Sequence, residues 1–426
     1  MKKLVLVFSL PLILSLQIFA QENFWEPTSA LQYGYVKSLA VNSIDYIYIG
    51  SEYEGILCSS DNGNHWVTKN NGIATSLISF IKIGYDNEIF AGTEVDSKVF
   101  QSSDSGENWT EMTNLITNNP IRSFAINQNN HLFAGSYGSG IFRSIDNGES
   151  WIQINNGLTL LLVTSLAINS NNNIFAGTLG NGIFRSTDNG ENWILKNNGL
   201  TNGFINCIMI NNSDYIFAGT NNGLYLSTDN GDNWLERSNG LSSKIVTTLT
   251  ENSTNMILLG NYDGVYRSVD NGEFWSLRNG GLTNYSITSL VFNSNDIAFA
   301  GTMGDGVFRS INSTTAIENE IDKIPSSYSL SQNHPNPFNP STKIKYAIPT
   351  SPFHPSPYQG EGQGERLITL IVFDVLGREV ATLVDEYKPA GSYEVEFNAF
   401  HLPSGVYFYQ LKAGAYIETK KMILLK

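Results

Sequence analysis

Short apolar segments of about five residues recur along most of the chain, and glycine or asparagine bounds each of them. One stretch illustrates the pattern: residues 165–169, 174–178 and 182–186 follow one another, and Trp193 opens a fourth segment. β-Branched and aromatic residues dominate these segments, and short runs of this kind between turn residues are typical of strands. The pattern therefore predicts small antiparallel sheets of four strands.

The turn between the third and fourth segments carries a repeated motif, S-x-D-x-G-x-x-W. Its glycine supplies a positive φ, and its serine hydroxyl and aspartate carboxylate cap backbone N–H groups. Six copies are complete and recur every 41 to 43 residues, with the aspartates Asp61, Asp104, Asp146, Asp188, Asp229 and Asp270. A repeat of this length is typical of a β-propeller, in which each small sheet buries its faces against its neighbours.

A seventh copy of the motif begins at Ser310 and then loses its glycine and its tryptophan. Of the seven tryptophans, only Trp25 lies outside the complete motifs, and it precedes an apolar segment as Trp66 does. We therefore expect the segment from Phe24 to supply the outer strand of the seventh sheet, which joins both ends of the ring and removes a free edge. The sequence thus predicts a seven-bladed propeller over residues 21–313.

The repeated motif resembles the Asp-box, or bacterial neuraminidase repeat, of sialidases, sortilin-type receptors, xyloglucan-cleaving hydrolases and photosystem II assembly propellers. The resemblance covers residues 24–313 and implies the same seven-bladed fold. It says little about activity, because these relatives share blades and differ in chemistry. One copy per blade is what a scaffold requires, so we interpret the box residues as structural.

Residues 1–20 predict a secretory signal peptide. Lys2 and Lys3 precede an apolar run over residues 4–16. Ile18, Phe19 and Ala20 then form the expected cleavage site before Gln21. The apolar run is shorter than the roughly 20 residues that span a bilayer, which makes a membrane anchor the weaker alternative. No later segment is long and apolar enough to cross, so we expect no transmembrane span in the mature chain.

The composition changes where the repeat ends. An acidic linker over residues 314–327 leads into a second domain, residues 328–426. Strand-like segments predict a small immunoglobulin-like β-sandwich there, at residues 343–348, 367–374, 391–397, 405–412 and 417–425. The expected fold class is therefore all-β, a seven-bladed β-propeller followed by a small immunoglobulin-like β-sandwich.

Four pieces of the second domain stand out, at residues 335–340, 372–378, 390–393 and 402–409. The most characteristic positions are Pro335, Asn336, Pro337, Phe338, Asn339, Pro340, Gly377, Gly405 and Tyr407. Together these pieces closely resemble the type A C-terminal sorting domain of type IX secretion. The resemblance implies that the type IX machinery is a partner and that the protein reaches the cell surface or the medium.

One stretch of the second domain departs from that family. Residues 351–365 are rich in proline and glycine, and we interpret them as a flexible insertion. The alternative for the whole domain is an immunoglobulin-like module that packs on the propeller and carries no transport signal.

Acidic residues are concentrated in the first domain. Residues 21–322 carry 13 Lys and Arg against 30 Asp and Glu, whereas residues 323–426 carry 10 against 9. A field of that sign repels phosphate backbones, which excludes nucleic acid as a partner. Five scattered histidines and two distant cysteines show no metal-ligand spacing, so we expect no metal and no cofactor.

In the propellers that this chain resembles, ligands bind at the loops opposite the boxes, which join strand two to strand three and one blade to the next. The candidate residues of these loops are Glu52, Glu54, Glu94, Asp96, Tyr137, Tyr262, Asp263 and Asp305. Further aromatic side chains there are Tyr33, Tyr35, Tyr53, Phe204 and Tyr285. The carboxylates form an acidic sector over neighbouring blades, and aromatic rings stack on sugars or on peptide side chains.

The sequence singles out no catalytic residues. A glycoside hydrolase needs two carboxylates about 5 to 9.5 Å apart across a cleft, and no pair is singled out here. A sialidase needs several converging arginines, whereas the arginines of the propeller repeat from blade to blade and leave only Arg122 outside the pattern. The sequence favours a secreted propeller that binds glycan or protein ligands; the alternative is an extracellular glycoside hydrolase of the xyloglucanase or sialidase-like type.

Overall fold

A computed structural model of the protein describes residues 23–30, 34–95, 97–112, 117–314, 328–349, 366–388, 391–414 and 416–426. The expected signal peptide and the expected insertion at residues 351–365 lie outside this described part, as does the expected linker after Thr314. Two of the candidate loop residues, Tyr33 and Asp96, also lie outside it.

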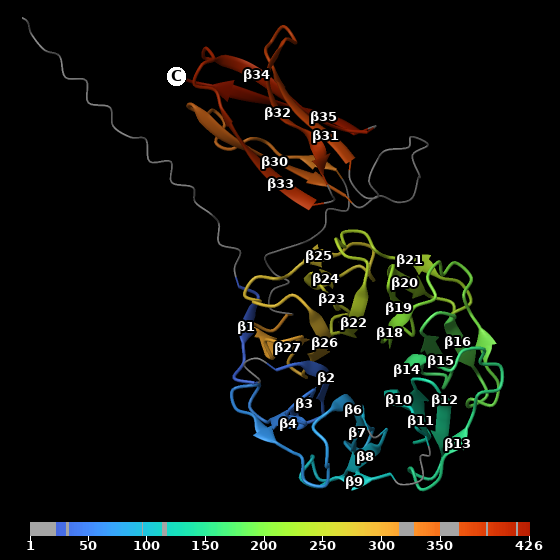
Figure 1. Ribbon diagram of the computed structural model, residues 1–426. Helices are drawn as coiled ribbons and strands as arrows, with labels where there is room; N and C mark the ends of the chain where they lie inside the picture. Colours follow the sequence, from blue (N-terminus) through green and yellow to red (C-terminus); the bar gives the residue numbers. More distant parts are fainter. Residues whose placement is uncertain are drawn as a thin grey trace, which may run out of the picture.

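Within the described ranges every regular element is a strand, and the strands of the first domain form seven sheets of four antiparallel strands. Figure 1 shows the seven sheets arranged around a ring as the blades of a propeller, with a small β domain following them in the chain. The predicted all-β fold and the seven blades are thus confirmed. No helix in these ranges has the length and hydropathy needed to cross a membrane.

Six sheets place their strands in chain order from the inside of the ring outwards, and the seventh does so for three strands and ends with β1. The sheets are numbered one to seven by their innermost strand. The first strands are β2 (Val36–Val41), β6 (Ile78–Ile83), β10 (Ile121–Ile126), β14 (Val163–Ile168), β18 (Ile205–Ile210), β22 (Val246–Glu251) and β26 (Ile287–Phe292). The second strands are β3 (Ile47–Ser51), β7 (Ile89–Thr93), β11 (Leu132–Ser136), β15 (Ile174–Thr178), β19 (Ile216–Thr220), β23 (Ile257–Asn261) and β27 (Ala298–Thr302).

The outer half of each sheet is shorter. The third strands are β4 (Ile56–Ser59), β8 (Val99–Ser102), β12 (Gly140–Ser144), β16 (Gly182–Ser186), β20 (Gly223–Ser227), β24 (Gly264–Ser268) and β28 (Val307–Ser310). The outermost strands are β5 (Val67–Thr68), β9 (Thr110–Glu111), β13 (Ile152–Gln153), β17 (Ile194–Leu195), β21 (Leu235–Glu236), β25 (Ser276–Leu277) and, in the seventh sheet, β1 (Trp25–Pro27).

The seventh sheet joins the two ends of the propeller. Trp25 of β1 pairs with Ser310 of β28, and the Trp25 indole N–H donates a 2.7 Å hydrogen bond to the carbonyl oxygen of Arg278 in the sixth sheet. Trp275 makes the equivalent bond to the fifth sheet. Gly281 has a φ of +93°, and a Cβ there would lie 1.9 Å from the Trp25 carbonyl oxygen, so only glycine fits against this strand.

The core of the propeller lies between neighbouring sheets. All five residues of β15 are buried, because a sheet packs on each face of this second strand. One hydrophobic cluster contains Phe133 of the third sheet together with Phe184 and Trp193 of the fourth. A single sheet therefore has no core of its own and depends on its neighbours for stability.

The repeated turn folds as its residues predict. In the fourth sheet the Ser186 hydroxyl donates to Asp188 Oδ1 at 2.8 Å and accepts from the Gly190 N–H at 2.9 Å. Asp188 Oδ1 also accepts from the Asn192 N–H at 2.9 Å. The serine and the aspartate thus satisfy donors that the tight turn would otherwise leave unpaired.

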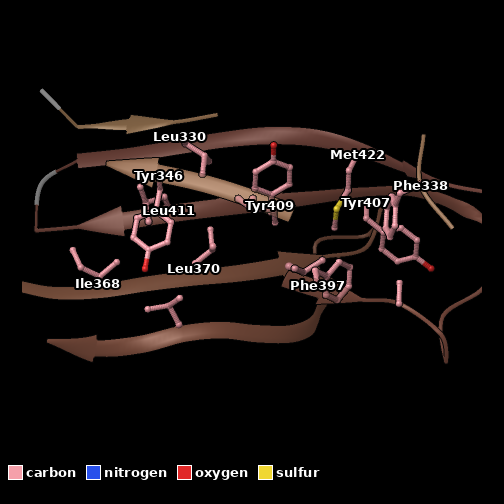
Figure 2. Packing of buried hydrophobic residues seen from close by; sticks show 14 of the residues in the cluster. Leu330, Phe338, Tyr346, Ile368, Leu370, Phe397, Tyr407, Tyr409, Leu411 and Met422 are labelled. Carbon is pink, nitrogen blue, oxygen red and sulfur yellow. The ribbon is translucent and has the colours of Figure 1, made fainter. Parts of the chain in front are cut away.

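The small C-terminal domain consists of two sheets around one core. The first sheet contains β29 (Ser329–Leu330), β30 (Ser341–Ile348) and β33 (Gly391–Asn398), and the second contains β32 (Glu379–Lys388), β31 (Arg366–Phe373), β34 (Gly405–Ala413) and β35 (Tyr416–Leu424). Figure 2 shows side chains of both sheets in this core, including Tyr346, Leu370, Phe397 and Tyr409.

Candidate functional site

The propeller ring has two faces that differ in their loops. The loop face carries the loops between second and third strands and the connections from one sheet to the next. The turn face carries the S-x-D-x-G-x-x-W turns and the turns between first and second strands. The candidate residues taken from the sequence that are described belong to the loop face.

Glu52 and Glu94 belong to a chain of ion pairs that crosses three sheets of the loop face. Lys37 Nζ lies 3.0 Å from Glu52 Oε2 and 3.9 Å from Glu94 Oε2. An Arg122 guanidinium nitrogen lies 2.7 Å from Glu94 Oε1, and the Arg122 Cζ atom lies 5.5 Å from the centre of the Tyr137 ring. This part of the acidic sector is therefore neutralised by two cations from the first strands β2 and β10.

Asp263 and Asp305 brace their loops from equivalent positions. The Ser242 hydroxyl donates to Asp263 Oδ2 at 2.8 Å, and the Thr283 hydroxyl donates to Asp305 Oδ2 at 2.6 Å. In the fourth sheet the Asn181 side-chain amide instead donates to the Thr159 hydroxyl, at 3.0 Å. A neutral asparagine thus bridges the equivalent positions in the fourth sheet, so the brace does not require a negative charge.

A second repeated motif, absent from the sequence-based prediction, anchors these loops from behind. Asn70 accepts a 2.7 Å hydrogen bond from the Ile56 N–H and donates a 2.9 Å bond to the carbonyl oxygen of Glu54. Asn155, Asn197 and Asn279 make the same pair of contacts in the third, fourth and sixth sheets. The signal was present in the sequence as Asn-Asn-Gly, or a near copy, in five of the seven sheets, at residues 70–72, 155–157, 197–199, 238–240 and 279–281.

Exposed aromatic side chains are concentrated on the loop face. Five of the six that the structure describes in the propeller lie there: Tyr35, Tyr53, Phe204, Tyr262 and Tyr285. They come from four consecutive sheets, the fifth, sixth, seventh and first. The ring centres of Tyr35 and Tyr53 lie 5.8 Å apart, edge to face. The sixth, Tyr85, lies on the turn face. Exposed apolar area gathered in one region is typical of a binding surface.

The repeated arginines of the third strands act as scaffold. Arg143, Arg185 and Arg309 each donate from a guanidinium nitrogen to the backbone carbonyl oxygen of an asparagine in the next sheet, at 2.5 to 2.7 Å. Arg122 lies outside this set, as the sequence indicated, and belongs to the loop face instead.

The turn face has a hollow that the sequence did not predict. It has a volume of about 350 Å³ and lies where the first strands of the sixth, seventh and first sheets end, lined by Glu251, Phe292, Val41, Asp45 and Asp296 among others. Asp45 and Asp296 are engaged by serines of the preceding sheets, Ser294 and Ser253. Among the described residues no three His, Cys, Asp or Glu side chains are grouped to hold a metal ion.

The sorting-motif residues of the C-terminal domain have separate structural roles. Phe338 is buried, and its N–H donates to the Ile423 carbonyl oxygen at 3.0 Å. The Tyr407 hydroxyl donates to the Pro403 carbonyl oxygen at 2.8 Å. Gly377 has a φ of +75° in the turn after β31, whereas Gly405 has no positive φ, and a Cβ there would meet nothing within 4 Å.

Comparison with known proteins identifies the C-terminal domain. Residues 333–425 match the secretion system C-terminal sorting domain. A domain of this kind engages the type IX machinery and directs secretion across the outer membrane to the cell surface or the exterior. No curated protein matches the chain as a whole.

Solved structures share the fold of the chain at low sequence identity. The extracellular domain of the hybrid two-component system BT3049 from B. thetaiotaomicron is 14% identical with a TM-score of 0.63, over 94% of this chain and 57% of that one. YCF48 bound to D1 peptide is 14% identical with a TM-score of 0.56, over 68% of this chain and 98% of that one. The Niastella koreensis GH74 enzyme is 16% identical with a TM-score of 0.53, over 66% of this chain and 43% of that one.

Proposed function

Because the sorting domain carries the propeller out of the cell, we propose that this propeller is an extracellular recognition module that binds glycan or protein ligands on its loop face. The observation that carries the proposal is the arc of exposed aromatic rings over four consecutive sheets of that face. Tyrosine combines a large apolar surface with a polar tip, which suits both sugar rings and peptide side chains. YCF48, which shares the fold, is solved with the D1 peptide, and this supports including peptides among the candidate ligands.

The engagement of the loop-face carboxylates supports binding over hydrolysis. Glu52 and Glu94 share one lysine, and Asp263 and Asp305 brace loops. A glycoside hydrolase needs one carboxyl group that can donate a proton and a second that acts on the sugar or on water.

The turns built on serine, aspartate and glycine further support assignment of the repeat to the Asp-box class, whose members include both binding proteins and hydrolases.

The proposal is tested by screening the full chain against a glycan array and a peptide library, followed by two variants. Tyr53→Ala and Tyr262→Ala together remove two exposed rings from the loop face, and Tyr85→Ala removes one from the turn face as a matched control. We expect the double variant to weaken binding at least tenfold and the control to leave it unchanged. Equal effects of both variants, or turnover of the bound glycan, would overturn the proposal.

A further inference from the structure

The fifth position of the first strands differs in one sheet. Six sheets place a neutral side chain there, and the second sheet places a lysine: the seven residues are Ala40, Lys82, Ala125, Ala167, Met209, Thr250 and Val291. In a repeat protein, the residue type shared by the copies is what the scaffold needs. Lys82 is therefore not explained by the architecture of the ring.

Solvent reaches Lys82 although protein surrounds it. The first strands contact one another around the whole ring, and the Lys82 side chain is exposed on this inner wall. The fifth positions of the fourth to seventh sheets are partly exposed as well, so water reaches this level of the inner wall. The surrounding protein displaces part of the water that would hydrate the ammonium group. This partial desolvation lowers the pKa of Lys82.

Lys82 also lacks a partner in an acidic domain. Among the described residues it makes no ion pair and no hydrogen bond through its side chain, although carboxylates outnumber cations by 30 to 13 over residues 21–322. The two other cations of the first strands, Lys37 and Arg122, lie on the neighbouring strands β2 and β10 at the second position, nearer the loop face, and share Glu94. The remaining four first strands carry one charged residue, Glu251, which accepts a hydrogen bond from the Asn212 N–H at the turn face.

We propose that Lys82 forms an anion site on the inner wall of the ring, which takes a single oxyanion such as a carboxylate, phosphate or sulfate group. An anion held there gains a charge-assisted hydrogen bond in surroundings that hydrate the ammonium group poorly. Lys37 and Arg122 are already paired with Glu52 and Glu94, so among the described first strands Lys82 is the cation that is free to take an anion. The site does not depend on the loop-face ligand, because the Lys82 side chain is itself exposed to solvent.

The test is a titration of the full chain, labelled with ¹³C-lysine, with sodium acetate, phosphate or sulfate at pH 7 and constant ionic strength. The ε-methylene NMR signal that is present in wild type and absent from Lys82→Met is assigned to Lys82. The matched control is Lys244→Met, which removes the same charge from an exposed lysine paired with Glu236 at 2.9 Å. We expect the Lys82 signal to shift saturably at millimolar anion in wild type and in the control variant.

The relative affinities of the three anions identify the chemistry of the group that the site accepts. A Lys82 signal that moves linearly, or no further than the Lys244 signal, overturns the proposal and leaves Lys82 as a solvated side chain. Should Lys82→Met fail to fold, Lys82→Arg keeps the charge, and its guanidinium N–H signal must then show the same saturable shift.

Discussion

Asp45 in the first sheet accepts two hydrogen bonds from Ser294 in the seventh, at 2.8 Å from the backbone N–H and at 2.5 Å from the hydroxyl. The same contact joins Ser253 of the sixth sheet to Asp296 of the seventh. The turns between first and second strands therefore hold neighbouring sheets together on the turn face, and the Asp45 contact closes the ring.

Removal of this contact is expected to weaken ring closure. Asp45→Ala deletes both acceptors and is expected to lower the free energy of unfolding by about 1.5 to 3 kcal/mol, the usual range for hydrogen bonds to a charged group, in addition to the strain of alanine at a φ of 63°. Asp45→Asn keeps one acceptor oxygen and is expected to lose less. Urea unfolding of both variants is the measurement, and an Asp45→Ala protein as stable as wild type would contradict the assignment.

The serine of a repeated turn is expected to contribute more to stability than the residue that follows it. Ser186→Ala leaves the buried Gly190 N–H without a partner and is expected to cost about 1 to 3 kcal/mol of stability. Thr187→Ala, an exposed position in the same turn, is the control and is expected to change stability by less than about 0.5 kcal/mol. Thermal unfolding of the two variants compares them directly.

The aspartates of the repeated turns predict loss of stability in acid. Hydrogen bonds from the residue four positions on lower the pKa of Asp61, Asp104 and Asp146 to about 2. The folded value is below the ordinary value near 3.9, so this contribution is present above about pH 4 and is lost as the pH falls towards 2. Asp146→Asn should reduce the slope of stability against pH in that window, while Asp86→Asn, at an exposed turn position, should not.

Lys82 is expected to reduce the stability of the fold at neutral pH. Burial lowers its pKa below the unfolded value near 10.4, so the unfolded chain binds the proton more readily and stability rises with pH between the two values. Lys82→Met should therefore be more stable than wild type at pH 7, by a margin that shrinks as the pH approaches 10. Denaturant unfolding from pH 7 to 10 measures this, with Lys244→Met as the control.

Alanine substitutions at the two glycines of the sorting motif are expected to distinguish an effect on folding from an effect on export. Gly377→Ala forces a Cβ into a φ of +75° and is expected to destabilise the domain by about 1 kcal/mol. Gly405→Ala has open space around it and is expected to leave stability nearly unchanged. Loss of secretion by Gly405→Ala from a type IX-competent host would mean that the machinery reads this backbone directly, and normal secretion would mean that it does not.

The fold was predictable from sequence because its determinants are local and repeated. The contacts of Ser186, Asp188 and Gly190 fall within one turn, and six copies of that turn predicted the period. The partial copy at Ser310, together with Trp25, predicted the seventh blade. The partners of Glu94 could not be predicted in the same way, since Lys37, Glu94 and Arg122 come from three different sheets. Lys82 was hidden for another reason: the sequence of β6 reads as an ordinary strand, and only its place in the inner ring makes the charge unusual.

The position of β1 in the seventh sheet has a mechanical consequence. β28 is held between β27 and β1, and it is the last strand of the propeller before the sorting domain. A force applied through the sorting domain would therefore act on a strand that has hydrogen-bonded neighbours on both sides. The sheet cannot peel away from its edge under such a load, and the ladders on both sides of β28 must break together before the ring opens.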